Sequence, residues 1–270
     1  MTTAPVGKLV VKQAVPSIII MMVSAMYNMA DTYFVSSLGT SAVAAVGVSF
    51  SLMAIIQAVG FFFGHGSGGF ISRALGSQNT ADAGKMAATG FFSAFILGLG
   101  ITIFGTIFLS PLARLLGSTS SILPYAFDYL RFILLGAPFM VASFMLNNLL
   151  RYQGSAFFSM IGMVSGAVIN IGLDPLFIFV FHLGVKGASL ATMISQIVSC
   201  IILFIMGCTR KGNIPILPAN FVPSLKKYRE IICGGSPSFL RQSIAGLAVI
   251  LLNNKAGAYG DAVIAAISIV

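Results

Sequence analysis

Two carboxylates lie inside stretches of sequence that otherwise have the composition of lipid-spanning helices. They are Asp31 in the first stretch and Asp174, which is followed by Pro175, in the fifth. A charge near the centre of a bilayer costs roughly 2.5–3.5 kcal/mol, so such a group is normally paired, protonated or bound to a cation. The whole chain has only six Asp and Glu residues. Their placement suggests a cation-coupled transporter.

Other polar residues share helix faces with these carboxylates. Residues three, four or seven positions apart lie on one face of an α-helix. Three stretches carry polar stripes at such spacings: Ser17, Ser24, Asn28 and Asp31; Gly166, Asn170 and Asp174; Ser189, Thr192, Gln196 and Ser199. At about 1.5 Å per residue, Asp31, Asp174 and Thr192 all fall roughly 8–15 Å below the same end of their helices. Three helices thus bring oxygen atoms to one level, where Na⁺ or H⁺ could bind; purely structural hydrogen bonds are the alternative.

Pro175 adds an irregularity to the fifth stretch. Proline has no N–H, so the carbonyl of Ile171 loses its helical partner and the helix is expected to bend. A freed carbonyl beside Asn170 and Asp174 suits a hard cation such as Na⁺. Pro175 is therefore predicted to be a hinge next to the cation site.

The composition places the chain in a membrane. Hydrophobic residues make up 57% of it and charged residues 8%, against about 25% charged residues in soluble domains. The net charge of +9 raises the question of a nucleic-acid partner, but the distribution of Lys and Arg gives a topological explanation. With the N-terminus inside, ten fall on the cytoplasmic side, namely Lys8, Lys12, Arg73, Lys85, Arg151, Arg210, Lys211, Lys226, Lys227 and Arg229. This bias predicts an internal N-terminus and no nucleic-acid partner.

Runs of about 20 apolar residues define the expected spans. They lie near 14–37, 43–64, 86–110, 125–150, 158–181, 188–208 and 233–257, and an eighth begins at about Ala262. The predicted organisation is an all-α polytopic membrane protein with a six-helix lobe over 1–208, a cytoplasmic linker over 209–232 and the start of a second lobe over 233–270.

An internal repeat supports this division. At an offset of 221 residues Pro16-Ser17 falls on Pro237-Ser238, Gly39 on Gly260 and Ala44-Ala45 on Ala265-Ala266. The period contains an even number of spans, so the copies have the same orientation and form a parallel repeat. We therefore expect about 12 spans in the complete protein.

Other motifs favour packing or binding rather than catalysis. The run Phe63-Gly64-His65-Gly66-Ser67-Gly68-Gly69 superficially resembles a nucleotide-binding loop, but no strand precedes it and close helix packing explains its glycines better. His65 and His182 lie toward opposite sides of the membrane and cannot share a metal ion. Asp128 and Arg131 are expected to pair at spacing i, i+3. Without a nucleophile and base in a catalytic pattern, we expect neither an enzyme nor an organic cofactor. The candidate cargo-binding residues are Tyr27, Asn28, Asn147, Met163 and Gln196.

Several short motifs resemble those of one transporter family. They are Met29-Ala30-Asp31-Thr32-Tyr33-Phe34-Val35 with Leu38-Gly39, Ser72-Arg73-Ala74-Leu75-Gly76, Asn170-Ile171-Gly172-Leu173-Asp174-Pro175 and Gly187-Ala188-Ser189-Leu190-Ala191-Thr192. In this order the motifs resemble those of the multidrug and toxic compound extrusion (MATE) family. The resemblance implies two six-helix lobes, a cation site made of Asp31, Asn170, Asp174 and Thr192, and a bending point at Pro16. It also implies export of amphipathic, often cationic drugs in exchange for Na⁺ or H⁺, in the plasma membrane of a prokaryote, by a monomer in contact with membrane lipid.

Three other functions stay open at this point. A lipid-linked precursor flippase of the same wider superfamily should carry several Arg or Lys residues inside its spans, and here only Arg241 clearly does. An intramembrane enzyme lacks visible catalytic residues. A channel or a non-transporting half-protein is the third alternative.

Overall fold

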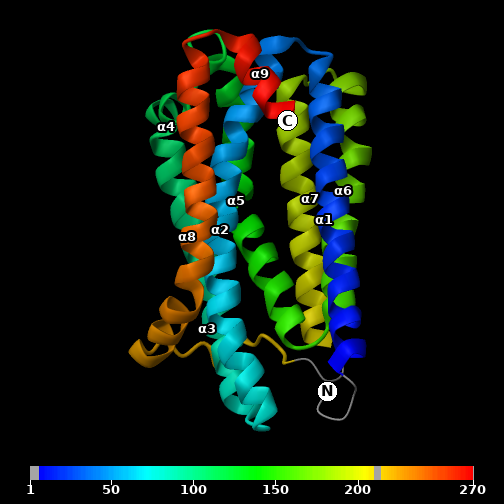
Figure 1. Ribbon diagram of the computed structural model, residues 1–270, viewed down its shortest axis with the longest axis vertical. Coiled ribbons are helices and arrows are strands. Elements are labelled where there is room, and N and C mark those ends of the chain that lie inside the picture. The colour runs from blue at the N-terminus through cyan, green and yellow to red at the C-terminus, as the bar shows by residue number, and fades with distance from the viewer. Residues whose placement is uncertain (1–5, 210–213, 270) are drawn as a thin grey trace.

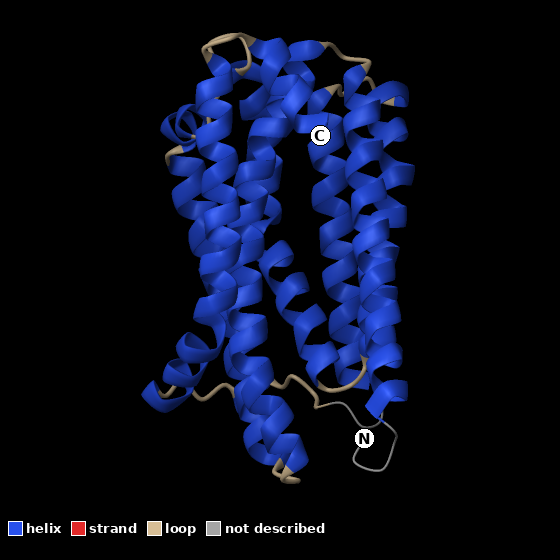
Figure 2. Ribbon diagram, in the orientation of Figure 1, coloured by secondary structure: helices blue, strands red, loops and turns tan. Residues whose placement is uncertain are grey.

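The computed structural model describes residues 6–209 and 214–269, and all of the regular structure in these ranges is helical (Figure 2). Seven of the helices are long and apolar enough to cross a membrane. The helices are α1 (Val6–Ser36), α2 (Thr40–Gly76), α3 (Thr80–Ile107), α4 (Leu109–Leu115), α5 (Leu123–Tyr152), α6 (Ala156–Pro175), α7 (Val185–Thr209), α8 (Leu225–Gly257) and α9 (Asp261–Ile269), with a π-helical segment η1 (Leu176–Val180) and a 3-10 turn η2 (Pro218–Asn220).

Each predicted span corresponds to a helix, with two differences in the connections. The short helix α4 lies in a region predicted as the end of the third span and the loop after it; it has only 7 residues, too few to show a periodic pattern. The helix α8 begins at Leu225, inside the segment predicted as a linker, because the Ser224 hydroxyl accepts a hydrogen bond from the Lys227 N–H at 3.4 Å and caps it. Its first turns are charged, so a search for apolar runs could not find them.

The helices form two groups with α5 between them. The helices α1, α6 and α7 pack together, and α2 packs against α3, α8 and α9 (Figure 1). The helix α5 contacts both groups through α2 and α7. In α2 and α5, 72% of the residues in the apolar 18-residue stretch of the helix are buried, against 6% in α1. The helix α1 is therefore peripheral and rests mainly on α6.

The glycine-rich run of α2 packs closely against two neighbours, as the sequence predicted. A Cβ at Gly60 would lie 2.6 Å from the Phe144 Cβ, and one at Gly64 would lie 2.8 Å from the Asn148 Cβ, both on α5. On another face, a Cβ at Gly66 would collide with the Ile231 carbonyl of α8. The glycines thus let α5 and α8 approach the backbone of α2.

The backbone repeats where the sequence repeats. Gly39, before α2, has φ = 113°, and Gly260, before α9, has φ = 101°. These left-handed conformations suit glycine in both turns. The preceding helices α1 and α8 contain Pro16 and Pro237 and begin at the same end of the bundle (Figure 1). We call this end, where α1 begins, the N-end and the opposite one the far end.

A polar cluster ties α9 to the far end of the bundle. The Asp261 carboxylate accepts hydrogen bonds from the hydroxyls of Ser41 at 3.0 Å, Thr119 at 2.7 Å and Ser121 at 2.6 Å. These hydroxyls come from α2 and from the loop before α5. The second copy of the repeat is thereby joined to two elements of the first.

Candidate functional site

The residues predicted to bind a cation lie in the far half of the bundle. Asn170 of α6 donates through Nδ2 to Asp174 Oδ1 and to Thr192 Oγ1 of α7, both at 3.3 Å. Asp31 of α1 is close enough for its charge to act on Asp174. All four side chains are at most 2% exposed. We call Asp31, Asn170, Asp174 and Thr192 the carboxylate site.

This site has acceptor atoms without donors. Among the described residues, no hydrogen bond reaches Asp31 Oδ1, Asn170 Oδ1 or Asp174 Oδ2. A buried acceptor that lacks a partner costs about 1–3 kcal/mol, and more if it is charged. Three such oxygens from two helices fit a hard cation or protons, since Na⁺ takes oxygen ligands. No group of three or more His, Cys, Asp or Glu side chains occurs in the part of the chain that the structure describes, so the donor set does not resemble a transition-metal site.

Tyr129 is a residue of this site that the sequence did not indicate. Its hydroxyl donates to Asp31 Oδ2 at 3.0 Å, and its side chain is fully buried. It holds one oxygen of Asp31 and leaves the other without a donor. A tyrosine near the start of an apolar span is common at membrane interfaces, so only the fold distinguishes this one.

The helix changes type at Pro175. The α-helix α6 ends there and continues as the π-helical segment η1, in which the Phe181 N–H donates to the Leu176 carbonyl at 3.0 Å. The predicted irregularity next to Asp174 is therefore present. Pro16 lies inside the continuous helix α1, and its role as a bending point stays a prediction.

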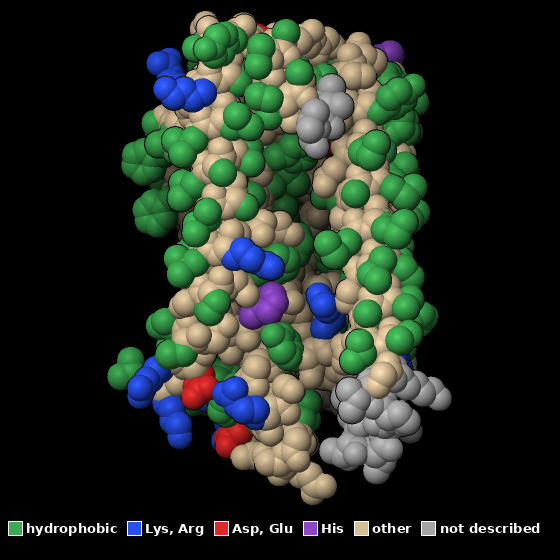
Figure 3. All heavy atoms as spheres, in the orientation of Figure 1, with side chains coloured by type: hydrophobic (Ala, Val, Ile, Leu, Met, Phe, Trp, Pro, Cys, Tyr) green, Lys and Arg blue, Asp and Glu red, His purple; other side chains and the backbone are tan. Residues whose placement is uncertain are grey.

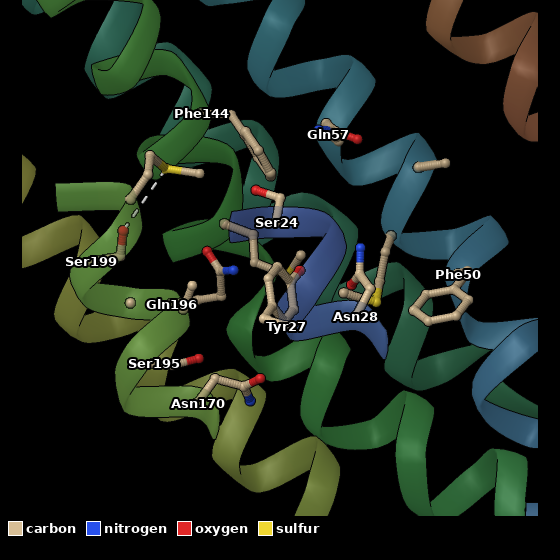
Figure 4. A pocket seen from close by; sticks show the side chains of 16 residues that line it. Ser24, Tyr27, Asn28, Phe50, Gln57, Phe144, Asn170, Ser195, Gln196 and Ser199 are labelled. Atoms are coloured by element: carbon tan, nitrogen blue, oxygen red, sulfur yellow. Dashed lines mark hydrogen bonds between the residues drawn. The ribbon is translucent and has the colours of Figure 1, made fainter. Parts of the chain in front are cut away.

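A cavity of about 270 Å³ adjoins the carboxylate site. It includes four of the predicted cargo-binding residues, Tyr27, Asn28, Met163 and Gln196. Tyr27, Asn28 and Gln196 face the same space (Figure 4). The lining residues that the sequence did not indicate include Phe50, Met53, Gln57 and Ser195. Of these, Gln57 and Ser195 could have been found, because each is a polar residue in the middle of an apolar span.

One side chain belongs to both the cavity and the carboxylate site. Asn170 lines the cavity (Figure 4), and its Nδ2 donates to Asp174 and Thr192. Its Oδ1 has no donor among the described residues. A change in the ligands of the carboxylate site therefore reaches the cavity wall through one amide.

Two sequence predictions do not agree with the geometry. Asn147 is not among the residues that line the cavity; its Nδ2 donates to the Ser159 hydroxyl of α6 at 2.7 Å, and it is buried between helices. The predicted pairing of Asp128 with Arg131 is wrong, because Asp128 Oδ1 lies 3.4 Å from Nζ of Lys186 at the start of α7. Spacing along one helix could not reveal a partner on another.

Similar proteins share both the sequence and the arrangement of helices. The family model described as MatE matches residues 16–176. The multidrug export protein MepA of Staphylococcus saprophyticus is 34% identical over 95% of this chain, and that of Staphylococcus aureus strain MRSA252 is 30% identical over 98%. A solved structure of the MATE multidrug transporter DinF-BH, in complex with a ligand, superposes with a TM-score of 0.92 at 33% identity, covering 99% of this chain and 60% of that one.

The chain spans only part of these relatives, 57% of the S. saprophyticus protein and 59% of the S. aureus one. The region that the family model matches contains Asp31, Asn170 and Asp174 of the carboxylate site and ends at the start of the π-helical segment. The family match over most of the chain, the relatives' identity and the structural superposition agree. The chain belongs to the MatE family of multidrug and toxic compound extrusion transporters.

Proposed function

We propose that the complete protein is a secondary active transporter that exports amphipathic, often cationic drugs in exchange for Na⁺ or H⁺. The cation binds at Asp31, Asn170, Asp174 and Thr192, and the cargo binds in the adjoining cavity. The observation that carries the proposal is the position of Asn170, whose amide lines the cavity and bonds Asp174. Binding of the two ligands is thereby mutually dependent.

The composition of the cavity supports a drug-like cargo. Aromatic and thioether side chains line it, including Tyr27, Phe50, Phe144, Met53 and Met163. Aromatic faces attract cations and flat rings, and Met adapts to varied shapes. The relatives named as multidrug export proteins and the solved multidrug transporter with its bound ligand are consistent with such cargo.

The peripheral position of α1 supports the proposal that this helix moves during transport. Its outer face is exposed at many apolar residues, for example Met22 at 62% and Met29 at 71%, and it packs mainly on α6. Neutralising Asp31 and Asp174 by protons or Na⁺ removes the repulsion between them and lets α1 bend at Pro16. The cavity then narrows and releases its cargo outward. Outward release requires that the N-terminus lies inside the cell. The protein acts as a monomer in the plasma membrane of a prokaryote.

The test is drug efflux from cells that express the complete protein under imposed Na⁺ or H⁺ gradients. The variants Asp31→Asn and Asp174→Asn remove the two charges at nearly constant shape. Asp128→Asn is the matched control, because Asp128 is a half-exposed carboxylate at the far end, paired with Lys186. We expect efflux to follow one of the two gradients, to disappear in both site variants and to persist in the control.

The opposite result would contradict the coupling site. Efflux that continues in Asp31→Asn and Asp174→Asn at the wild-type rate would leave these carboxylates structural. Efflux that follows neither gradient would exclude the exchange mechanism itself. The gradient that drives efflux in the wild type identifies the coupling ion.

A further inference from the structure

Three basic side chains from three helices lie near one another in the N-end half of the bundle. They are His65 of α2, Arg151 of α5 and Arg241 of α8, and we call them the basic cluster. The charges of Arg151 and Arg241 both act on the His65 ring. Lys and Arg (blue) and His (purple) side chains gather around the lower part of the hollow between the two helix groups (Figure 3).

The close packing of α2 places these side chains. Gly64 faces Asn148 and Gly68 faces the Tyr152 ring, so Arg151 projects from the part of α5 that runs beside His65. On α8, the residue after Arg241 is Gln242, whose Nε2 donates to Gln57 Oε1 of α2 at 3.1 Å. The close packing of α2 against α5 and α8 thus brings both arginines near enough to His65 for their charges to act on its ring.

Arg151 and Arg241 have no side-chain carboxylate partner in the described ranges. The chain has six Asp and Glu residues, all of them in these ranges, and each is engaged elsewhere. Asp31 and Asp174 form the carboxylate site, and the other four contact the following partners: Asp82 with Asn79, Asp128 with Lys186, Glu230 with Arg73, and Asp261 with three hydroxyls. Arg241 is near the middle of α8, a candidate membrane span. An unpaired charge at such a depth is costly and indicates a binding partner outside the described part of the chain.

A cavity of about 350 Å³ is lined by two members of the basic cluster, His65 and Arg151. It is lined by Gln13, His65, Ser72, Asn148, Arg151 and Tyr152. The His65 Nδ1 bonds the Phe61 carbonyl at 3.0 Å, which leaves Nε2 for a ligand. Because Gln13 belongs to α1 and the others to α2 and α5, a ligand here contacts both helix groups.

We propose that the basic cluster binds a phosphate group, either of an anionic phospholipid headgroup or of free phosphate. Each planar guanidinium can meet two oxygens of one anion in a bidentate arrangement. Two guanidinium groups on different helices therefore suit an anion that presents oxygens in several directions, which a phosphate does and a carboxylate does not. Asn148, Gln13 and Ser72 add neutral polar groups around it. The site is separate from the carboxylate site and does not depend on the proposed exchange mechanism.

The test measures phosphate and lipid binding by the complete purified protein. Native mass spectrometry counts the lipids retained from detergent micelles that contain equal amounts of phosphatidylglycerol and phosphatidylcholine. A thermal-shift titration with inorganic phosphate, at constant ionic strength, measures binding of the free anion. The double variant Arg151→Gln/Arg241→Gln is compared with Arg114→Gln/Lys255→Gln, which removes the same charge at the far end.

We expect the wild type to prefer phosphatidylglycerol or to be stabilised by phosphate. The site variant should lose that binding at least about tenfold, because it loses charged hydrogen bonds to the anion. The control variant should keep it. Preference for phosphatidylglycerol alone identifies a lipid ligand, and stabilisation by inorganic phosphate alone identifies the free anion. The proposal is overturned if the wild type shows neither, or if the site variant binds as the wild type does. Should the double variant fail to fold, Arg151→Lys keeps the charge and removes the bidentate geometry, and wild-type binding by it would overturn the proposal equally.

Discussion

The carboxylate site and the basic cluster lie toward opposite ends of the bundle and are built on different helices. The carboxylates come from α1 and α6 and are at most 2% exposed, with oxygens that no donor reaches in the described part of the chain. The basic residues come from α2, α5 and α8, and one of their two arginines is half-buried and the other exposed. Opposite charges in one protein normally pair, because pairing offsets the cost of placing each of them in the membrane.

Here the fold keeps the opposite charges apart. Each region lacks a counter-ion that the described part of the chain does not supply. One region lacks a cation and the other lacks an anion. Four predictions test whether the two regions are independent, and what holds each of them in place.

The largest effect is expected from removing each site in turn. Asp31→Asn/Asp174→Asn should abolish cation-driven drug efflux and leave phosphate or phosphatidylglycerol binding unchanged. Arg151→Gln/Arg241→Gln should abolish phosphate or phosphatidylglycerol binding and leave the ion that drives efflux unchanged. Efflux driven by Na⁺ or H⁺ gradients and native mass spectrometry on the same variants measure both quantities. Loss of both activities in either variant would show that the two sites act as one.

The next effect concerns the packing that places the basic cluster. In Gly64→Ala the new Cβ lies 2.8 Å from the Asn148 Cβ, so α2 and α5 must separate, at a cost of about 1–3 kcal/mol. Thermal denaturation in detergent should show a lower Tm, together with weaker phosphate binding. Gly69→Ala is the control in the same helix, since its Cβ has only the end of the Arg73 side chain nearby, at 3.9 Å. An equal Tm for both variants would contradict the close-packing account.

A smaller effect is expected at the hydroxyl that holds Asp31. Tyr129→Phe removes the hydrogen bond to Asp31 Oδ2 and leaves a buried carboxylate oxygen without a donor, which costs about 1–3 kcal/mol. We expect a lower Tm and slower cation-driven efflux, with phosphate binding unchanged. Tyr125→Phe, four residues earlier in α5 and 41% exposed, should change neither. Wild-type efflux and Tm in Tyr129→Phe would show that Tyr129 does not position Asp31.

The smallest effect is expected inside the cargo cavity. Gln196 lines the cavity and its Oε1 has no donor among the described residues, so Gln196→Ala should weaken cargo binding by about tenfold or less. The control Asn147→Ala changes a residue outside the cavity and should lower stability more than affinity. Fluorescence titration with a cationic dye measures affinity. Equal loss of affinity in Gln196→Ala and Asn147→Ala would mean that the cavity does not define the binding site.

Local patterns predicted those features that depend on one helix at a time. The apolar runs gave the spans, and the helical spacing of Asn170 and Asp174 gave the site residues of α6. The repeat at Gly39 and Gly260 was visible because glycine is needed wherever φ is positive. Long-range contacts could not be predicted in this way. Tyr129 beside Asp31, Lys186 beside Asp128 and Ser159 beside Asn147 each join separate helices, and their pairing depends on how the bundle packs.

The double membership of Asn170 has a thermodynamic consequence for the proposed exchange. When two ligands influence one another through a shared group, the coupling free energy is the same in both directions. A cation that lowers the affinity for cargo by some factor must have its own affinity lowered by cargo to the same extent. In the proposed exchange, a drug that fills the cavity therefore helps to expel the cation as strongly as the cation helps to expel the drug. The amide of Asn170 is the group that links the two binding sites.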